Sequence, residues 1–337
     1  MLSRNLTVAA GIATGIAATF LRRHRTPANF RNQIAFVTGG SRGLGLLLAR
    51  ELASRGAKVA IAARDGEELE RAQKQIRSEG GDVLSLEADM TMRDEAEAAV
   101  RKIEDEFGEV DILVNNAGTI AVGPMETMTI DDYRNSINTH FWGPYFTTMA
   151  VLPAMQRKQA GRIVNISSIG GKISVPHLLP YSVGKFALTG FSEGLRSELL
   201  KDHVYVTTVC PGLMRTGSPR NAFFKGNNEA EYAWFSISDA LPVLSMNANR
   251  AARRIVDACA RGDAEIILTV PAQLATIIHG VFPDITVDML GLMNRFLPAA
   301  GGIGTDVRTG KESKSKASPS WATALNERAA LDNNQIA

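Results

Sequence analysis

Short apolar segments alternate along most of this chain with longer stretches in which apolar residues recur at helical spacing. The short segments are rich in β-branched residues, which favour strands. Because they are almost continuously apolar, they are typical of a parallel sheet with helices on both faces. We predict seven strands, in residues 34–38, 58–62, 83–87, 112–115, 162–167, 205–209 and 265–269.

The first two helices of this pattern have recognisable ends. Residues 43–55 place four leucines at a 3.6-residue spacing, and Gly56 follows as a natural C-cap. Asp65 and Glu68 have the form of a capping box. We therefore expect Asp65 to begin the next helix rather than to bind a ligand.

Two later segments depart from the alternation. Residues 217–241 lack clear periodicity and carry five aromatic residues, so we interpret them as an insertion or lid. Residues 284–297 place Leu290, Met293 and Leu297 on one helix face. We expect that helix to dock on the core, with a partner or a bilayer surface as the alternatives.

Both ends of the chain have unusual compositions. Residues 6–21 carry no charge and precede the basic cluster 22–25. As a helix this run is about 24 Å long, short of the roughly 30 Å hydrocarbon layer. A membrane anchor or interfacial helix, an organellar presequence and an unstructured leader therefore stay open. From Gly301 onward, lysines and serines with few apolar residues predict disorder.

Composition excludes several classes of protein. With 337 residues, 45% of them hydrophobic, the chain can bury a sizeable core. Lys+Arg total 37 against 35 Asp+Glu, so no basic excess suggests a nucleic-acid partner. The two cysteines, Cys210 and Cys259, support neither a disulfide framework nor a zinc site. We expect no metal site.

A glycine-rich turn follows the first predicted strand. Thr38-Gly39-Gly40-Ser41-Arg42-Gly43-Leu44-Gly45 has the pattern T-G-x-x-x-G-x-G between a strand and a helix. Such glycines let the backbone approach a pyrophosphate, which the helix N-terminus stabilises. The strand–turn–helix context predicts a dinucleotide site and a doubly wound, Rossmann-like α/β fold with strand order 3-2-1-4-5-6-7.

Two arginines indicate which nicotinamide dinucleotide this site prefers. NAD enzymes place an acidic residue near the end of the second strand, where this chain has Ala63 and then Arg64. Arg42 and Arg64 could form charge-assisted hydrogen bonds to a 2′-phosphate. We therefore predict NADP(H) in preference to NAD(H), although both arginines could instead be solvated surface groups.

Tyr181 and Lys185 lie one helical turn apart, so they share a helix face. Ser168 follows the fifth predicted strand, and Asn138 lies in the helical region before it. Together these residues resemble the short-chain dehydrogenase/reductase family over about residues 32–269. The resemblance implies that Asn138, Ser168, Tyr181 and Lys185 form a catalytic tetrad.

Further motifs carry the same resemblance. Asn115-Asn116-Ala117-Gly118 resembles the family's N-N-A-G motif. Asp89 occupies the place of an acid that holds the adenine amino group. Pro211, Gly212 and Thr216 resemble the segment beside the nicotinamide carboxamide. The resemblance thus implies a cofactor site made of Gly39, Ser41, Arg42, Gly43, Leu44, Gly45, Arg64, Asp89, Asn116, Ala117, Gly118, Tyr181, Lys185, Pro211, Gly212 and Thr216.

The residue types also suit the chemistry. Hydride transfer to a carbonyl requires a proton, and a phenol with a pKa near about 10 needs help to donate and accept at neutral pH. We expect Lys185 and the oxidised nicotinamide ring to lower the pKa of Tyr181. Ser168 would donate to the substrate oxygen, Lys185 would also bind the nicotinamide ribose, and Asn138 would hold a water.

We therefore predict an oxidoreductase that transfers hydride between NADP(H) and a carbonyl or alcohol substrate. The aromatic segment and the C-terminal helix suggest an apolar substrate, such as a lipid, sterol or isoprenoid. A nucleotide-sugar epimerase or dehydratase and a non-catalytic NADP(H)-sensing scaffold are the alternatives.

The predicted domains are a leader or anchor in residues 1–31, the enzyme domain in 32–280, an amphipathic extension in 281–300 and a tail in 301–337. Membrane contact through 6–21 and 284–297 would put the enzyme on the cytoplasmic side of a membrane. A cytoplasmic enzyme and an organellar presequence stay open, as does a homo-oligomer.

Overall fold

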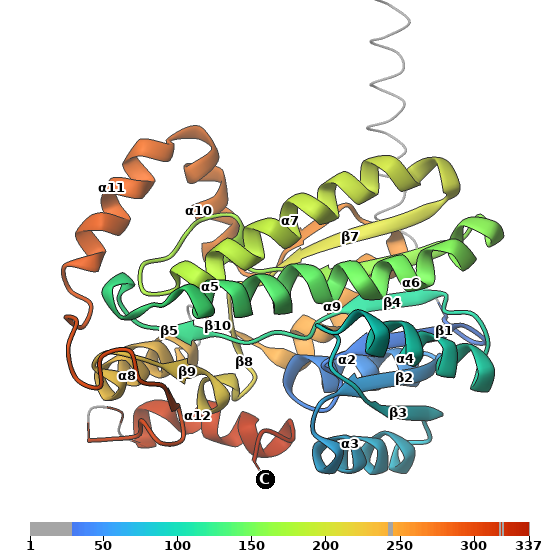
Figure 1. Cartoon of the computed structure of the whole chain (residues 1–337), viewed down its shortest axis with the longest axis horizontal. Coiled ribbons are helices and arrows are strands. Elements are labelled where there is room, and N and C mark those ends of the chain that lie inside the picture. The colour runs from blue at the N-terminus through green and yellow to red at the C-terminus, as the bar shows by residue number, and fades with distance from the viewer. Residues whose placement is uncertain (1–28, 242–244, 317, 319, 337) are drawn as a thin grey trace, which may run out of the picture.

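The computed structural model describes residues 29–241, 245–316, 318 and 320–336. Its centre is a seven-stranded parallel sheet in the order β11-β7-β6-β4-β1-β2-β3 (Figure 1). In chain order this is 3-2-1-4-5-6-7, so the predicted fold and strand order are confirmed. The strands are β1 (Ile34–Thr38), β2 (Lys58–Ala63), β3 (Val83–Glu87), β4 (Ile112–Asn115), β6 (Gly161–Ile166), β7 (Val204–Cys210) and β11 (Glu265–Ile267).

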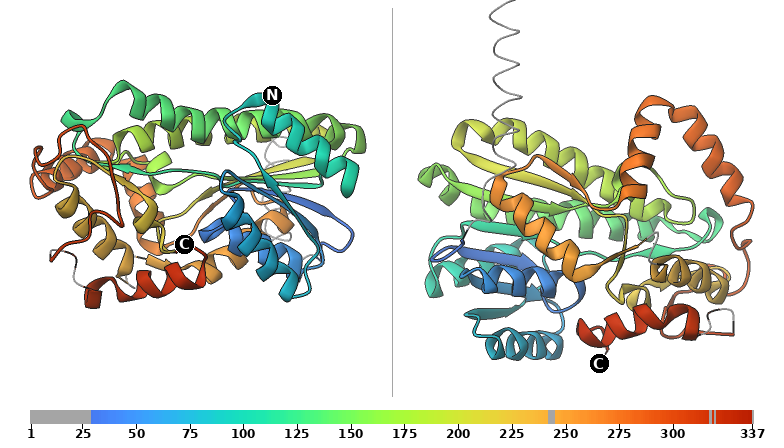
Figure 2. Two further views of the ribbon diagram at one scale, coloured as in Figure 1. Left: turned by 60° about the horizontal axis from the view of Figure 1, so that its bottom comes forward. Right: turned by 180° about the vertical axis from the view of Figure 1, so that it is seen from behind.

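Helices cover both faces of this sheet (Figure 2). Along β1, Ala35 and Val37 belong to one core, whereas Ile34 and Phe36 belong to the other. Both sets are buried, which explains why the strand is apolar from Ile34 to Val37. The first core takes residues from α2 (Gly43–Ser54), α3 (Gly66–Ser78) and α9 (Ala248–Arg261); the second takes them from α4 (Arg93–Glu106), α6 (Gly143–Lys158) and α7 (Leu179–Leu199).

The local boundaries follow the sequence signals. Helix α2 ends at Ser54, and Gly56 adopts a φ of +91° two residues later. Asp65 is the N-cap of α3, and its carboxylate accepts a hydrogen bond from the Glu68 N–H at 2.9 Å. The predicted capping role of Asp65 is thus confirmed.

The predicted insertion contains ordered elements at the end of the main sheet. A small sheet joins β5 (Ala121–Val122), β9 (Phe223–Phe224) and β12 (Arg308–Thr309), and a second joins β8 (Leu213–Arg215) to β10 (Ser245–Asn247). Helix α8 (Asn228–Ala240) packs beside them. Phe224, Tyr232 and Phe235 are buried together, so these aromatic residues form a third apolar core.

The segment after the main sheet differs from its prediction. Helices α10 (Val270–Val281) and α11 (Pro283–Asn294) pack against each other and extend away from the sheet (Figure 1). No residue of α11 is buried. The expected docking of this helix on the core is therefore wrong, because its apolar side chains remain exposed.

The C-terminal tail also differs from its prediction. Instead of disorder, the structure shows α12 (Ser320–Asp332) packed on α8, with Thr323, Asn326 and Ala330 buried. The tail has few apolar residues, but polar contacts and close backbone approaches hold it. Residues 1–28 of the predicted leader 1–31 lie outside the described residues. Among those described, no helix has the length and apolarity that a membrane crossing requires.

Candidate active site

A cavity of about 1150 Å³ lies at the edge of the main sheet where its parallel strands end. Ligands of open α/β sheets bind in this crevice because the loops after the strands converge there. Every predicted site residue except Asn138 lines the cavity: Gly39, Ser41, Arg42, Gly43, Leu44, Gly45, Arg64, Asp89, Asn116, Ala117, Gly118, Ser168, Tyr181, Lys185, Pro211, Gly212 and Thr216.

The glycine turn forms a cradle that only glycine permits at three positions. Gly39 and Gly43 have φ values of +63° and +57°, a region that side chains with a Cβ disfavour. A Cβ on Gly45 would lie 2.0 Å from the Gly39 carbonyl oxygen. A turn of this shape at the start of α2 suits the diphosphate of a dinucleotide, although the Gly43 N–H already donates to the Asn333 carbonyl oxygen at 2.9 Å.

The loop after β4 is hydrogen-bonded to this cradle. The Thr38 Oγ1 accepts from the Asn116 and Ala117 N–H groups, at 3.0 and 3.1 Å. The Asn116 Nδ2 donates to the Thr38 and Gly39 carbonyl oxygens, at 3.1 Å each. The N-N-A-G motif thus holds the glycine turn in shape.

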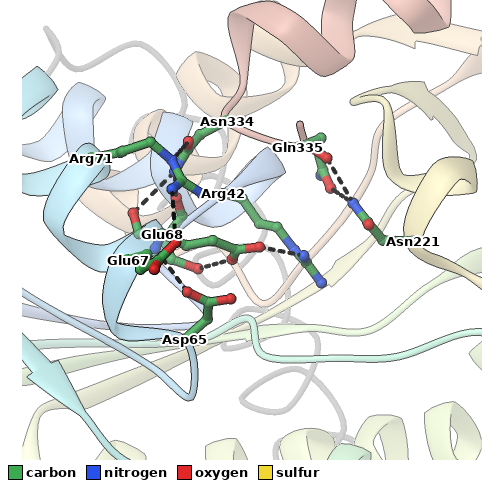
Figure 3. A network of polar contacts seen from close by, with 9 residues as sticks. Arg42, Asp65, Glu67, Glu68, Arg71, Asn221, Asn334 and Gln335 are labelled. Carbon is green, nitrogen blue, oxygen red and sulfur yellow. Dashed lines mark hydrogen bonds and ion pairs between the residues drawn. The ribbon is translucent and has the colours of Figure 1, made fainter. Parts of the chain in front are cut away.

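Glu68, which the sequence analysis assigned only to a capping box, lies at the predicted 2′-phosphate position. Glu68 accepts from Arg42 Nη1 at 2.6 Å and from Ser41 Oγ at 3.0 Å (Figure 3). Arg64 is largely exposed and lies 3.8 Å from Asp89. Arg42 is thus already paired with Glu68. This end of the cavity therefore carries negative charge, although no acid stands at the end of the second strand.

The chemical end of the cavity brings together Ser168, Tyr181 and Lys185. Ser168 follows β6, and its Oγ accepts from the Gly170 N–H at 3.0 Å. Lys185 Nζ lies 5.7 Å from the centre of the Tyr181 ring and donates to the Ile166 carbonyl oxygen at 2.8 Å. Helix α7 presents both residues on one face, as their four-residue spacing predicts.

Burial controls the proton affinities of these groups. It raises the pKa of Tyr181 to about 12, although the hydrogen bond with Ser168 opposes the rise. Burial lowers the pKa of Lys185 to about 7. With the chain's own groups alone, burial thus raises the pKa of Tyr181 and keeps its phenol protonated at neutral pH. The expected lowering includes the oxidised nicotinamide ring and stays a prediction.

Comparison with protein families agrees with this geometry. The model described as short chain dehydrogenase matches residues 33–224, more than half of the chain. This chain belongs to the short-chain dehydrogenase family. It is thus an NAD(P)-dependent dehydrogenase/reductase with a Rossmann-like sheet.

Relatives of this short-chain dehydrogenase come from animals as well as bacteria. It is 31% identical over 279 residues to mouse "Dehydrogenase/reductase SDR family member 7B", covering 80% of this chain and 85% of the mouse protein. It is 36% identical over 196 residues to human "Dehydrogenase/reductase SDR family member 7", covering 57% of this chain and 58% of the human protein.

Solved structures share its fold. L-sorbose reductase from Gluconobacter frateurii, solved with NADPH and L-sorbose, superposes with a TM-score of 0.64 at 23% identity. The match covers 72% of the short-chain dehydrogenase and 97% of the sorbose reductase. At this identity the likeness establishes the fold alone.

Within this short-chain dehydrogenase, Asn138 is not in the cavity. It is exposed, whereas His140 two residues later is buried and lines the cavity. At roughly 100° per residue, positions two apart on a helix face nearly opposite directions. The structure therefore does not bring the Asn138 side chain to the cavity, and its role in holding a water stays a prediction. Residues 138–142 form a π-helical turn between α5 (Ile130–Ile137) and α6.

His140 is the residue that the sequence analysis missed. Its ring packs edge-on against Tyr181 at 5.3 Å, and its Nε2 lies 2.9 Å from the Thr119 carbonyl oxygen. Burial and the nearby Lys185 hold the pKa of His140 well below its ordinary value, so the imidazole is neutral. His140 belongs to no apolar repeat, so the sequence carried no local signal for it.

The segment predicted to lie beside the nicotinamide follows β7. The Pro211 carbonyl oxygen accepts from the Ile169 N–H at 2.8 Å, so this turn and the Ser168 turn hold each other. A Cβ on Gly212 would lie 2.3 Å from Thr269 Oγ1. Thr216 is buried at the end of β8, so its Oγ1 is held close to the cavity.

Beyond Tyr181 the cavity wall is mainly apolar and aromatic. Trp234 Nε1 donates to Glu231 Oε2 at 2.6 Å, and His177 Nδ1 lies 2.7 Å from Glu231 Oε1. The buried Glu231 thereby orients the Trp234 ring. The other apolar residues of this wall are Ile120, Val175, Leu178, Leu213, Met214, Phe223 and Phe235.

Proposed function

We propose that this enzyme reduces an apolar ketone or aldehyde with NADPH. The observation that carries the proposal is the position of Tyr181, which lines one cavity between the glycine cradle and the aromatic wall. A carbonyl beside Tyr181 would have its carbon open toward the nicotinamide end and its substituents against the aromatic wall.

The bound cofactor would supply the hydride, and the chain's own residues would manage the oxygen and the proton. Tyr181 donates its phenolic proton to the carbonyl oxygen, and Ser168 Oγ–H donates a hydrogen bond to the same oxygen as charge develops. Lys185, when protonated, stabilises the phenolate that remains. Because burial keeps Tyr181 protonated, these groups favour reduction over oxidation.

The proposed preference for NADP(H) depends on an exchange of partners. A 2′-phosphate beside Ser41 would accept from Arg42 and Arg64, while Arg42 released its contact with Glu68. Glu68 then reduces the preference for NADP(H), because its carboxylate repels the phosphate.

This exchange predicts that Glu68→Gln strengthens the binding of NADPH about fivefold to tenfold. Charged hydrogen bonds contribute about 1.5–3 kcal/mol, and in the wild-type chain part of that energy is needed to break the contact between Arg42 and Glu68. NADH binding should change less than twofold. Glu70→Gln, on the same helix but outside the cavity, is the control. Weaker binding of NADPH by Glu68→Gln would contradict the proposal.

Partner contacts form a further part of the proposal. The uncharged leader 6–21 and the exposed hairpin α10–α11 would attach the enzyme to the cytoplasmic side of a membrane. Supporting this, the hairpin exposes large apolar residues at Leu274, Ile277, Val281, Phe282, Ile285, Met289, Leu292 and Phe296. The aromatic group of Phe141, Trp142, Tyr145, Phe146 and Phe191, on the π-helical turn 138–142, α6 and α7, would suit a homo-oligomer.

The test measures the turnover of a panel of apolar and polar carbonyl compounds through the loss of NADPH absorbance. We expect turnover of apolar members only, and a loss of at least about a hundredfold in kcat for Tyr181→Phe with NADPH affinity nearly unchanged. Tyr133→Phe, outside the cavity, is the matched control. Binding of NADPH without turnover of any member would instead support the sensing scaffold.

A further inference from the structure

The C-terminal end of the chain lies on the glycine turn of the proposed cofactor site (Figure 3). The Asn333 carbonyl oxygen accepts from the Gly43 N–H at 2.9 Å, and Asn333 Nδ2 donates to the Thr216 carbonyl oxygen at 3.2 Å. The Asn334 Nδ2 donates to the carbonyl oxygens of Ser41 and Glu68, at 2.8 and 3.0 Å. The tail thus bridges several segments that line the cavity.

Arg71 completes the fixing of Asn334. Its Nε donates to Asn334 Oδ1 at 2.9 Å, so both polar ends of the Asn334 amide have partners on α3 or the glycine turn. Asn334 and Ser41 are 293 residues apart in sequence. The contact therefore joins the two ends of the folded chain at the cofactor site.

Helix α12 holds this segment in place. The Gln335 and Asn333 N–H groups donate to the Ala330 and Ala329 carbonyl oxygens, at 2.9 and 3.0 Å. Helix α12 approaches Gly217 so closely that a Cβ there would lie 2.5 Å from the Ala330 Cα. The segment is therefore a built part of the fold.

Gln335 directs an amide group into the cavity. Its side chain is buried, and its Oε1 accepts from Asn221 Nδ2 at 2.6 Å, which sets the orientation of the amide. The Nε2 consequently lies on the side of the glycine turn, 2.5 Å from where a Cβ on Gly43 would be. Among the described residues, no protein acceptor is recorded for this Nε2.

We propose that residues 333–335 are part of the dinucleotide site and that Gln335 Nε2 donates a hydrogen bond to the cofactor's diphosphate. This proposal rests on the proposed function, which places a nicotinamide dinucleotide in this cavity. A diphosphate on the glycine turn would meet the α2 N-terminus from one side and the Gln335 amide from the other. Because Gln335 lies against the glycine turn beside that position, we expect the tail to slow the release of the cofactor.

The proposal predicts a graded series of affinities. Gln335→Ala removes the donor and should weaken NADPH about fivefold to tenfold, as the loss of one hydrogen bond does. Gln335→Glu keeps the size and the acceptor for Asn221 but sets a carboxylate against the diphosphate, so it should weaken binding more than Gln335→Ala. NADH should weaken by the same factors, because the diphosphate is common to both cofactors.

The experiment is fluorescence titration of the full chain with NADPH and NADH, together with stopped-flow displacement of bound NADPH. A chain ending at Asp332 should release NADPH at least about tenfold faster. Arg328→Ala, an exposed change on α12, is the matched control and should behave as wild type.

Unchanged affinities in all Gln335 variants would overturn this inference alone. Tighter binding in the truncated chain would also overturn it, because the tail would then compete with the cofactor. If the wild-type chain binds neither dinucleotide, the proposed function fails, and this inference fails with it.

Discussion

At the residue scale, burial rather than charge pairing dominates the groups around the cavity. Tyr181, Lys185, His140 and Asp239 all have pKa values shifted toward their neutral forms, and desolvation is the largest cause in each. An active site built this way keeps a phenol protonated beside a lysine that can lose its proton near neutral pH. That combination suits a proton donor that must be recharged after each turnover.

His140 and Asn138 provide a paired test of the catalytic group. His140→Ala removes the ring packed on Tyr181 and should lower kcat by about tenfold or more, because small displacements of catalytic groups are costly. Asn138→Ala should leave kcat within about twofold, since Asn138 is exposed. Steady-state kinetics at saturating cofactor would decide. A larger loss for Asn138→Ala would restore Asn138 to the tetrad.

Asp239 makes stability depend on pH. Burial raises its pKa to about 7, and its Oδ2 and the Asn326 Oδ1 are both buried without a hydrogen-bond partner among the described residues. The pKa of Asp239 in the folded chain exceeds the ordinary value of 3.8. The contribution of Asp239 to the stability of the fold is therefore fully present below about pH 4 and is lost as the pH rises to about 7.

Asp239→Asn should prevent this loss of stability at higher pH. Its amide can still accept from the Met214 N–H, as Asp239 Oδ1 does at 3.1 Å, and its NH₂ can donate to Asn326. We expect a higher melting temperature than wild type at pH 8 and a smaller difference between the two proteins at pH 5. Thermal unfolding at both pH values measures this. A variant less stable at pH 8 would show that Asp239 is ionised and stabilising there.

At the element scale, the position of α12 depends on one glycine. Gly217 has a φ of +84°, and its Cα faces the Ala330 backbone. Gly217→Ala should therefore strain the turn and separate α12 from its site. Gly190→Ala is the matched control, because Gly190 lies in the interior of α7 with open space around it. This change should raise the stability of the protein by up to about 1 kcal/mol.

The result can be followed by limited proteolysis of the tail beside NADPH titration. Gly217→Ala should be cleaved faster before α12 and should bind NADPH about as weakly as the chain that ends at Asp332. If Gly217→Ala and Gly190→Ala resist proteolysis equally, the close approach of α12 to Gly217 is not what holds the tail.

At the scale of the whole molecule, the two C-terminal segments have different surroundings. The tail is joined by polar contacts to the glycine turn and to α3, whereas the α10–α11 hairpin extends from the opposite side (Figure 1). Phe296 is 83% exposed and Met289 66% exposed. Exposed apolar side chains gathered on one projection are typical of a surface that meets another apolar phase.

We expect the full chain to sediment with anionic phospholipid vesicles more strongly than a chain that starts at Asn32. In the shorter chain, Met289→Ser with Phe296→Ser should abolish the remaining binding, because the hairpin would lose its most exposed apolar groups. Lys74→Ser with Lys201→Ser, two exposed changes on other surfaces, is the control. If the full chain stays in the supernatant, the proposed attachment is refuted.

The sequence by itself determined the elements whose signals are local. The runs 34–38 and 83–87 became strands with the predicted limits, and Asp65 became a helix cap, because periodicity and capping depend on a few neighbouring residues. The strands and turns also placed Ser168, Tyr181 and Lys185 correctly around one cavity, since parallel strands end at the same edge of a sheet.

Only the tertiary structure decided which polar residues meet across long sequence distances. Glu68 pairs with Arg42, His140 packs against Tyr181, and Gln335 reaches the glycine turn. None of these residues lies in an apolar repeat, so local patterns carry no signal for their partners. The tail is held by side-chain amides and a glycine contact rather than by apolar burial, and composition alone cannot register such contacts.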